Sequence, residues 1–159
     1  MEAPDRMKRA DLLSVLLLSA AIGLGAAREF IFVNLNYQLD FLLNQRTVNY
    51  AHSAFRAWAD HQSAEQLLRA KWAIAAGFVL MTMGLTIALA WVRLGGHRWT
   101  RTILLSFLAL GALALTLHAL SGILPAMYHV SIALLHGLQY PVPLLIVWMM
   151  SWLHSASRR

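Results

Sequence analysis

Long apolar runs separated by short polar segments dominate this sequence. The runs lie at about 12–33, 71–92, 102–124 and 126–154. A helix rises about 1.5 Å per residue, so each run is long enough to cross the ~30 Å hydrocarbon layer of a bilayer. No Asp, Glu, Lys or Arg occurs within 102–157 or 72–92, which no water-soluble surface sustains. The pattern predicts an all-α polytopic membrane protein, a four-transmembrane-helix bundle forming a single domain over 1–159.

The first apolar run continues into a striped polar stretch. From Ala26 to Asp40 (AAREFIFVNLNYQLD), apolar and polar residues keep a helical rhythm, and no Gly or Pro interrupts it as far as Leu43. We therefore expect the first helix to reach about Leu43 and to project beyond the bilayer. There it would enter an outer cap formed by residues about 34–70.

The cap is expected to contain a second, short helix. Apolar residues recur on one face of this segment and polar residues on the other, which predicts an interfacial helix lying on the bilayer between spans one and two. The apolar face consists of Val48, Ala51, Phe55 and Trp58. Ser63 followed by Gln66 is a capping-box pattern, and it predicts the start of the helix that becomes the second span.

Two prolines interrupt the last apolar run. Pro141 and Pro143 have no N–H to donate to the carbonyls of Gly137 and Gln139. We therefore expect a kink or a locally unwound turn inside the fourth span.

The basic residues outside the apolar runs indicate the topology. With four spans, one side holds five Lys and Arg residues spread over a long segment and the other holds eight in short segments. The eight are Arg6, Lys8, Arg9, Arg93, Arg98, Arg101, Arg158 and Arg159. The positive-inside rule then predicts cytoplasmic N- and C-termini. We expect an integral protein of a bacterial inner (cytoplasmic) membrane, with the cap outside.

Composition narrows the chemistry further. The chain has no Cys, so Cys-ligated zinc, iron–sulfur clusters and disulfide chemistry are excluded. The net charge of +6 comes from short basic clusters beside the apolar runs, without a continuous basic patch. Nucleic acid is therefore not an expected partner.

Polar residues at membrane depth gather toward the outer side. Counted along the helices from the turn near Leu124, His129, His118 and His136 lie roughly 6, 10 and 16 Å deep. Ionisable residues are costly in a bilayer and commonly line an interior or wet cavity, so this layer is the candidate binding site. Its predicted members are Arg28, Glu29, Asn36, Tyr37, Asp40, His118, Ser121, Tyr128, His129 and His136.

Arg28 and Glu29 have two interpretations. As neighbours on a helix they point about 100° apart. In the structural interpretation, Arg28 reaches a lipid phosphate while Glu29 bonds to His118 or Ser121; in the functional one, they line a groove for a headgroup or substrate. Small residues four apart favour close helix packing, so we expect one face of the first span to pack inside the bundle and to bring Glu29 with it. That face contains Ala21, Gly25 and Glu29.

Asn36 and Asp40 share a broad face with Glu29. They either extend a carboxylate-lined groove or dock the amphipathic segment of the cap. The docking partners would be Arg46, His52 or Arg56.

Cofactor sites have little support in the spacing of the histidines. His129 and His136 are two turns apart, about 10.5 Å, too far to chelate one ion together. No metal is therefore predicted. A b-type haem between His118 and either His136 or His129 stays open as an alternative, and no other cofactor is expected.

No nucleophile elbow or phosphate loop is present. We therefore expect a small non-catalytic membrane subunit, or a module that binds lipid or a protein partner; the partners would be the bilayer, other membrane subunits or a second copy. One alternative is an enzyme acting on a lipid-linked substrate at the outer leaflet, with His118 or His129 as general base oriented by Glu29. Further alternatives are the haem protein and a small transporter using the broken fourth helix.

Overall fold

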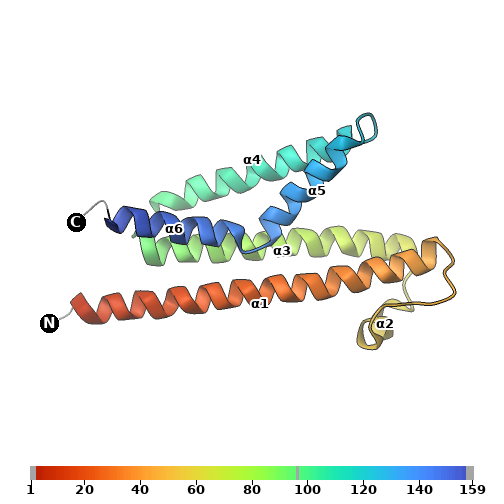
Figure 1. Cartoon of the computed structure of the whole chain (residues 1–159), viewed down its shortest axis with the longest axis horizontal. Coiled ribbons are helices and arrows are strands. Elements are labelled where there is room, and N and C mark those ends of the chain that lie inside the picture. The colour runs from red at the N-terminus through yellow and green to blue at the C-terminus, as the bar shows by residue number, and fades with distance from the viewer. Residues whose placement is uncertain (1–2, 96, 157–159) are drawn as a thin grey trace.

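The computed structural model describes residues 3–95 and 97–156, and this part of the chain consists of helices and their connections, without strands. Its six helices are α1 (Ala3–Leu43), α2 (Ser53–Ala59), α3 (Ala64–Leu94), α4 (Arg98–Leu120), α5 (Ala126–Gln139) and α6 (Val142–Ala156). Figure 1 shows that α1 begins and α6 ends at one end of the bundle, called here the terminal end. The α2 segment and the α4–α5 turn lie at the opposite end, called the cap end.

The first three apolar runs each form one long helix. Within the described ranges, three helices are long and apolar enough to cross a membrane: α1 from Arg9 onward, α3 and α4. The fourth run is divided into α5 and α6, which meet the same test as a pair bent by 61°. The predicted break is therefore confirmed. Helix α5 stops at Gln139, Tyr140 is extended, and α6 begins beside the prolines.

Local signals set the other helix ends. Ser63 and Gln66 form both hydrogen bonds of the predicted capping box at the start of α3. Gly95 ends α3 with a φ of 72°, in the left-handed region that favours glycine. Helix α1 ends at Leu43, as its pattern predicts.

Helices α1 and α3 run antiparallel along most of their lengths (Figure 1). The buried positions of α1 alternate in steps of four and three residues, the spacing of a coiled-coil seam. The positions that follow this spacing are Ala21, Gly25, Arg28, Phe32, Leu35 and Leu39; Ser14, Asn34 and Gln38 of α1 are buried as well. The expectation that Glu29 packs inside the bundle with Ala21 and Gly25 is thus wrong by one residue, because the seam passes through Arg28.

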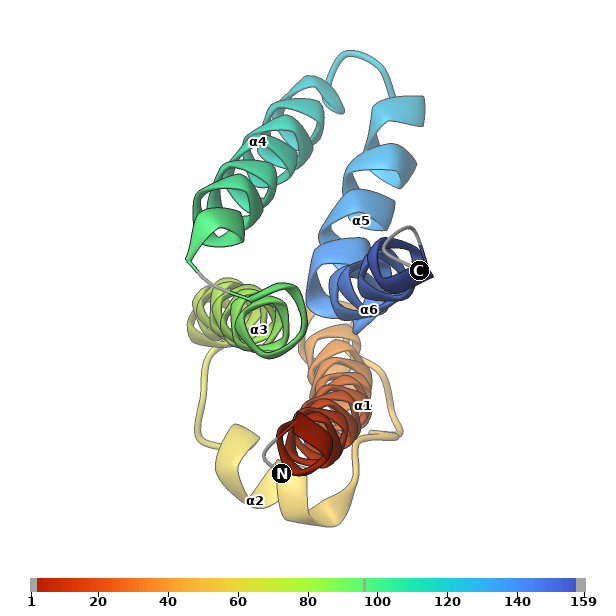
Figure 2. The same ribbon diagram turned by 90° about the vertical axis from the view of Figure 1, so that its left-hand side faces the viewer.

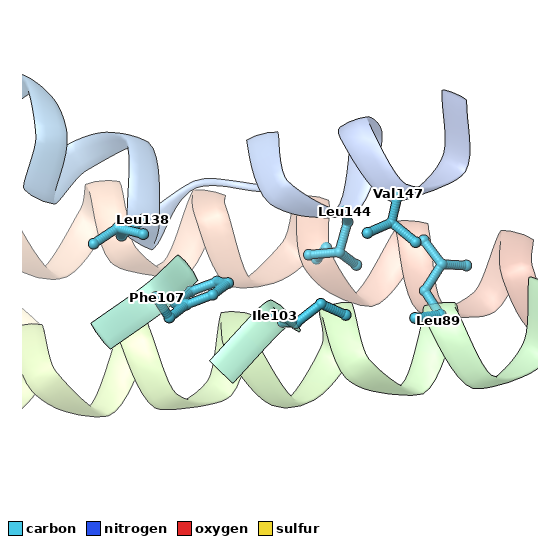
Figure 3. Packing of buried hydrophobic residues seen from close by; sticks show 8 residues of the cluster. Leu89, Ile103, Phe107, Leu138, Leu144 and Val147 are labelled. Carbon is cyan, nitrogen blue, oxygen red and sulfur yellow. The ribbon is translucent and has the colours of Figure 1, made fainter. Parts of the chain in front are cut away.

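The main apolar core lies toward the terminal end. There, side chains of α3, α4, α5 and α6 interlock with Ala21 of α1. Figure 3 labels six of them, Leu89, Ile103, Phe107, Leu138, Leu144 and Val147. This core holds α6 and the start of α4 firmly against α3.

A second core joins the cap to α1. Ala51 and Phe55 pack against Leu35 and Leu39, together with Ala59 and Leu67. Helix α2 is shorter than the pattern predicts, since Val48 and Ala51 lie in the connection before it. Two buried amides of α1 fix that connection: Asn49 donates to Gln38 (2.6 Å), and the His52 N–H donates to Asn34 (2.5 Å).

The α4–α5 hairpin diverges from the α1–α3 pair toward the cap end. Figures 1 and 2 show its turn well away from α1 and α3, whereas α6 and the beginning of α4 lie close to α3. The bend between α5 and α6 produces this divergence, because α6 stays on α3 while α5 leads outward.

Candidate functional site

A groove of about 500 Å³ lies between the α1–α3 pair and the diverging α4–α5 hairpin. It combines charged, amide, imidazole and apolar side chains from all four helices. Its lining consists of Arg28, Glu29, Phe32, Val33, Asn36, Leu68, Lys71, Trp72, Ala75, His118, Tyr128, Ile132, Leu135, His136 and Gln139. The groove is therefore the place where the divergence of the helices brings chemically active residues together.

Arg28 is the centre of the polar network in this groove. Its side chain is only 5% exposed. Nε donates to Gln139 Oε1 (3.0 Å), and Nη1 donates to Tyr140 OH (2.9 Å) and Glu29 Oε2 (3.1 Å). The guanidinium carbon also lies 4.7 Å from the ring centre of Phe32 and 4.8 Å from that of Tyr140, within cation–π range. A buried charge needs such a set of partners to offset the loss of water.

Two of the residues that Arg28 contacts, Gln139 and Tyr140, are the last residue of α5 and the extended residue after it. Since Pro143 cannot donate to the Gln139 carbonyl, that oxygen needs another donor, and Thr82 of α3 supplies its hydroxyl (3.4 Å). The Gln139 amide in turn donates to the Ala75 carbonyl (3.4 Å). Side chains of α1 and α3 therefore satisfy groups at the break between α5 and α6.

Glu29 faces outward from this network. Its side chain is 55% exposed, and its carboxylate accepts hydrogen bonds from Tyr140 OH (2.5 Å) and Arg28. The expected bond from Glu29 to His118 or Ser121 is not formed, and Ser121 instead donates to the His118 carbonyl on its own helix (2.6 Å). The hydrogen-bond partners of the Glu29 carboxylate are thus Arg28 and Tyr140.

Lys71 supplies a second cation to the groove. Its Nζ donates to the Asn36 side chain (2.8 Å), and within the described ranges it forms no ion pair. Asn36 therefore bonds to α3 and not to the cap. The docking interpretation does hold for Asp40, which pairs with Arg46 (3.2 Å).

Two of the three predicted histidines line the groove. The His118 ring lies against Trp72 (centroids 5.5 Å apart) and Tyr128 (5.9 Å), and the His136 ring lies beside Tyr140 (6.2 Å). His118 Nδ1 is buried without a hydrogen-bond partner. His129 is exposed, contacts Tyr128 and is not part of the lining.

The groove thus gathers six of the ten predicted residues: Arg28, Glu29, Asn36, His118, Tyr128 and His136. The other four, Tyr37, Asp40, Ser121 and His129, lie outside its lining. Sequence reasoning missed Lys71, Trp72, Gln139 and Tyr140 as site residues. Two signals point to them: Lys71 and Trp72 open the second apolar run, and Gln139 and Tyr140 directly precede the predicted break.

The groove offers limited ligands for metal or haem. Among the described residues, no group of three or more His, Asp or Glu side chains is placed to hold a metal ion. For a haem, the histidines that share the groove are His118 and His136, so the pairing of His118 with His129 loses its support. The lining contains two cations, imidazoles, amides and apolar side chains, and its carboxylate, Glu29, is already hydrogen-bonded to Arg28 and Tyr140. Such a lining suits an anionic, partly apolar ligand.

The fold and site define a class: an all-helical protein with three apolar helices of membrane-spanning length, or four if the bent pair is one span, and a polar groove between them. The chain matches no known protein family, no curated protein and no solved structure. Its function is therefore argued from the groove.

Proposed function

We propose that this chain is an integral membrane protein in which the bent α5–α6 pair forms the fourth span. The termini are cytoplasmic, because the terminal end carries Arg9, Arg93, Arg98 and Arg101, and the groove opens at the outer leaflet. The long apolar helices and the placement of α2 and the α4–α5 turn at the opposite end support this proposal.

The groove serves as a non-catalytic binding site for a membrane lipid. One observation carries this proposal: polar groups, including Arg28 and Lys71, share a groove of about 500 Å³ with apolar walls such as Leu135 and Ile132. A lipid has the same division between a polar head and an apolar chain. A soluble polar ligand would leave the apolar walls unused, and a purely apolar one would strip water from the charges.

Lipid retention tests this function. The protein is extracted in mild detergent, and co-purified lipid is quantified by mass spectrometry. Leu135→Trp fills the groove and should remove the retained lipid, whereas Leu108→Trp, on an exposed face of α4, should leave it in place. Equal lipid content in both variants would contradict the proposal.

Topology is tested by cysteine labelling, because the chain has no Cys of its own. Tyr50→Cys, in the exposed cap connection, should react with a membrane-impermeant maleimide added to intact cells. His97→Cys, in the α3–α4 turn, should react only after the cells are opened. The reverse result would invert the orientation.

A catalytic function has one observation in its favour, the presence of His118 and His136 in the same groove. A base needs an orienting partner, however, and Glu29 hydrogen-bonds to Arg28 and Tyr140 and to neither histidine. Incubating the purified protein with a total lipid extract decides between the two functions. Binding without chemical change supports the module, and a new lipid product that His118→Gln fails to form supports the enzyme.

A further inference from the structure

Three nitrogen atoms in the groove have unused capacity to donate hydrogen bonds. The bonds of Arg28 occupy Nε and Nη1 and leave Nη2 without a hydrogen-bond partner among the described residues. Lys71 Nζ has one bond, to Asn36, out of the three that an ammonium can donate. The other ring nitrogen of His118, Nε2, has no hydrogen bond to any residue that the structure describes, and the His118 side chain lines the groove. These donors come from α1, α3 and α4, on different walls of one groove.

The charge of the groove is positive. Arg28 and Lys71 contribute two positive charges, and Glu29 is the carboxylate in the described lining. The Glu29 carboxylate already accepts from Arg28 and Tyr140, so it does not reach Lys71. With neutral histidines the lining keeps an excess of one positive charge, which an anion would neutralise in a medium of low dielectric constant.

The three donors lie on three different helices, and this arrangement indicates which anionic group fits the groove best. A carboxylate has two oxygens, and a phosphodiester has two unesterified oxygens. A terminal phosphate has three, one for each wall. Donors on three walls are matched best by an acceptor that presents oxygens in three directions, so a terminal phosphate fits this arrangement better than either alternative.

We propose that the groove recognises a lipid with a terminal phosphate, such as phosphatidic acid, through Arg28 Nη2, Lys71 Nζ and His118 Nε2. This inference rests on the proposed lipid-binding function and specifies its ligand. The apolar walls receive the start of the acyl chains, and Trp72, against which His118 packs, lies where headgroup and chain meet.

The experiment compares lipids that differ only in the headgroup. Full-length protein in nonionic detergent is titrated with dioleoyl phosphatidic acid, dioleoyl phosphatidylglycerol or dioleoylglycerol, and bound lipid is counted by native mass spectrometry. We expect phosphatidic acid to bind at least about tenfold more tightly than phosphatidylglycerol, since one charge-assisted hydrogen bond is gained. Dioleoylglycerol should bind most weakly.

Matched variants locate the phosphate. Lys71→Gln and His118→Gln should each weaken the binding of phosphatidic acid about tenfold and reduce the preference over phosphatidylglycerol. Arg69→Gln removes a cation two residues away, on an exposed position paired with Glu65, and should change neither value. His129→Gln is the control for His118, because His129 lies outside the lining. Lys71→Arg keeps the charge and should retain the preference.

The outcomes separate the two proposals. If the three lipids bind equally and Leu135→Trp still removes them, the lipid-binding function stands and the phosphate assignment falls. If no lipid binds, both fall. Inorganic phosphate at the concentration of the lipid should fail to compete, because it lacks the chains. Competition at that concentration would overturn the assignment to a lipid, and equal losses in Arg69→Gln and Lys71→Gln would overturn the site.

Discussion

The two ends of α4 have opposite surroundings. Near the terminal end, Phe107 belongs to a close-packed cluster with Leu89 of α3 and Leu144 of α6. Near the cap end, His118 of the same helix contacts Trp72 at one edge of an open groove. Both halves contain helices of similar apolar character, so composition alone does not account for the difference. The direction of the neighbouring helices accounts for the difference, because α6 lies against α3 whereas α5 leads away from it.

That direction is set at the break between α5 and α6. A straight fourth helix would continue along α3 and fill the space that the groove occupies, as α6 does in the terminal half. The bend of 61° leads α5 away, and polar groups then line the space that it leaves. One proline-rich turn thus separates a close-packed half of the molecule from the half that contains the groove.

The largest expected effect is in the packed half. Phe107→Ala removes most of a buried ring and should lower the free energy of unfolding by about 3–5 kcal/mol. Leu135→Ala, in the wall of the groove, should cost less than half as much because its side chain already borders open space. Reversible unfolding in mixed micelles measures both. Equal losses would show that the groove wall is packed as tightly as the core.

The next effect is at Arg28, where the two halves meet. Arg28→Met leaves Gln139 and Tyr140 without their shared donor and should cost about 1–3 kcal/mol. In a double-mutant cycle, Gln139→Leu should cost less in the Arg28→Met protein than in the wild type, because its partner is already missing. Additive losses would show that this hydrogen bond does not hold the break.

A smaller and local effect is expected in the cap. Asn34→Ala removes the acceptor of the His52 N–H and should cost about 1 kcal/mol. Hydrogen exchange should then accelerate in the connection around His52 and leave the terminal half unchanged. Thr47→Ala, at an exposed position of the same connection, is the control and should change neither region. Faster exchange across α3 as well would show that the cap also supports the bundle.

The smallest effect is expected at Gly25, where α1 passes the break. A methyl group there would lie 3.6 Å from Pro141 Cδ and 3.7 Å from Tyr140 Cδ1, which is ordinary contact. Gly25→Ala should therefore be neutral or stabilise by up to about 1 kcal/mol, through the better helix propensity of alanine. Gly25→Leu should destabilise, because its branches would displace Pro141. Thermal unfolding in detergent measures both, and tolerance of leucine would mean that α1 and the break are not in close contact.

Much of the fold is readable from local pattern. The end of α1 at Leu43, the capping box at Ser63 and the break at the prolines follow from residue types within one or two turns. The side of α1 that is buried does not follow from composition, since Arg28 and Glu29 are adjacent and differ only by about 100° of rotation. The alternating steps that run through Gly25, Arg28 and Phe32 do identify it, because they continue the same seam on both sides.

The site was less predictable because it depends on distances between helices. Six of its residues follow from polar type and depth, but Lys71 joins them through a contact with Asn36, 35 positions earlier. His129 has the same chemistry as His118 and lies outside the groove, because it is one residue after Tyr128 and points elsewhere on α5. The pattern of apolar and polar residues predicts the helices and their polar positions. The rotation and divergence of the helices then determine which of those polar side chains line the same groove.

The hydroxyl of Thr82 on the Gln139 carbonyl has a consequence for the order of assembly. The break leaves that carbonyl without a donor from its own helix, and the replacement comes from α3, while Arg28 of α1 holds the adjacent side chains. The last segment to be synthesised bends at its own prolines, but the carbonyl exposed there and the adjacent side chains gain these partners only when α1 and α3 lie beside it. The N-terminal half of the chain acts as a template on which the C-terminal half completes its folding.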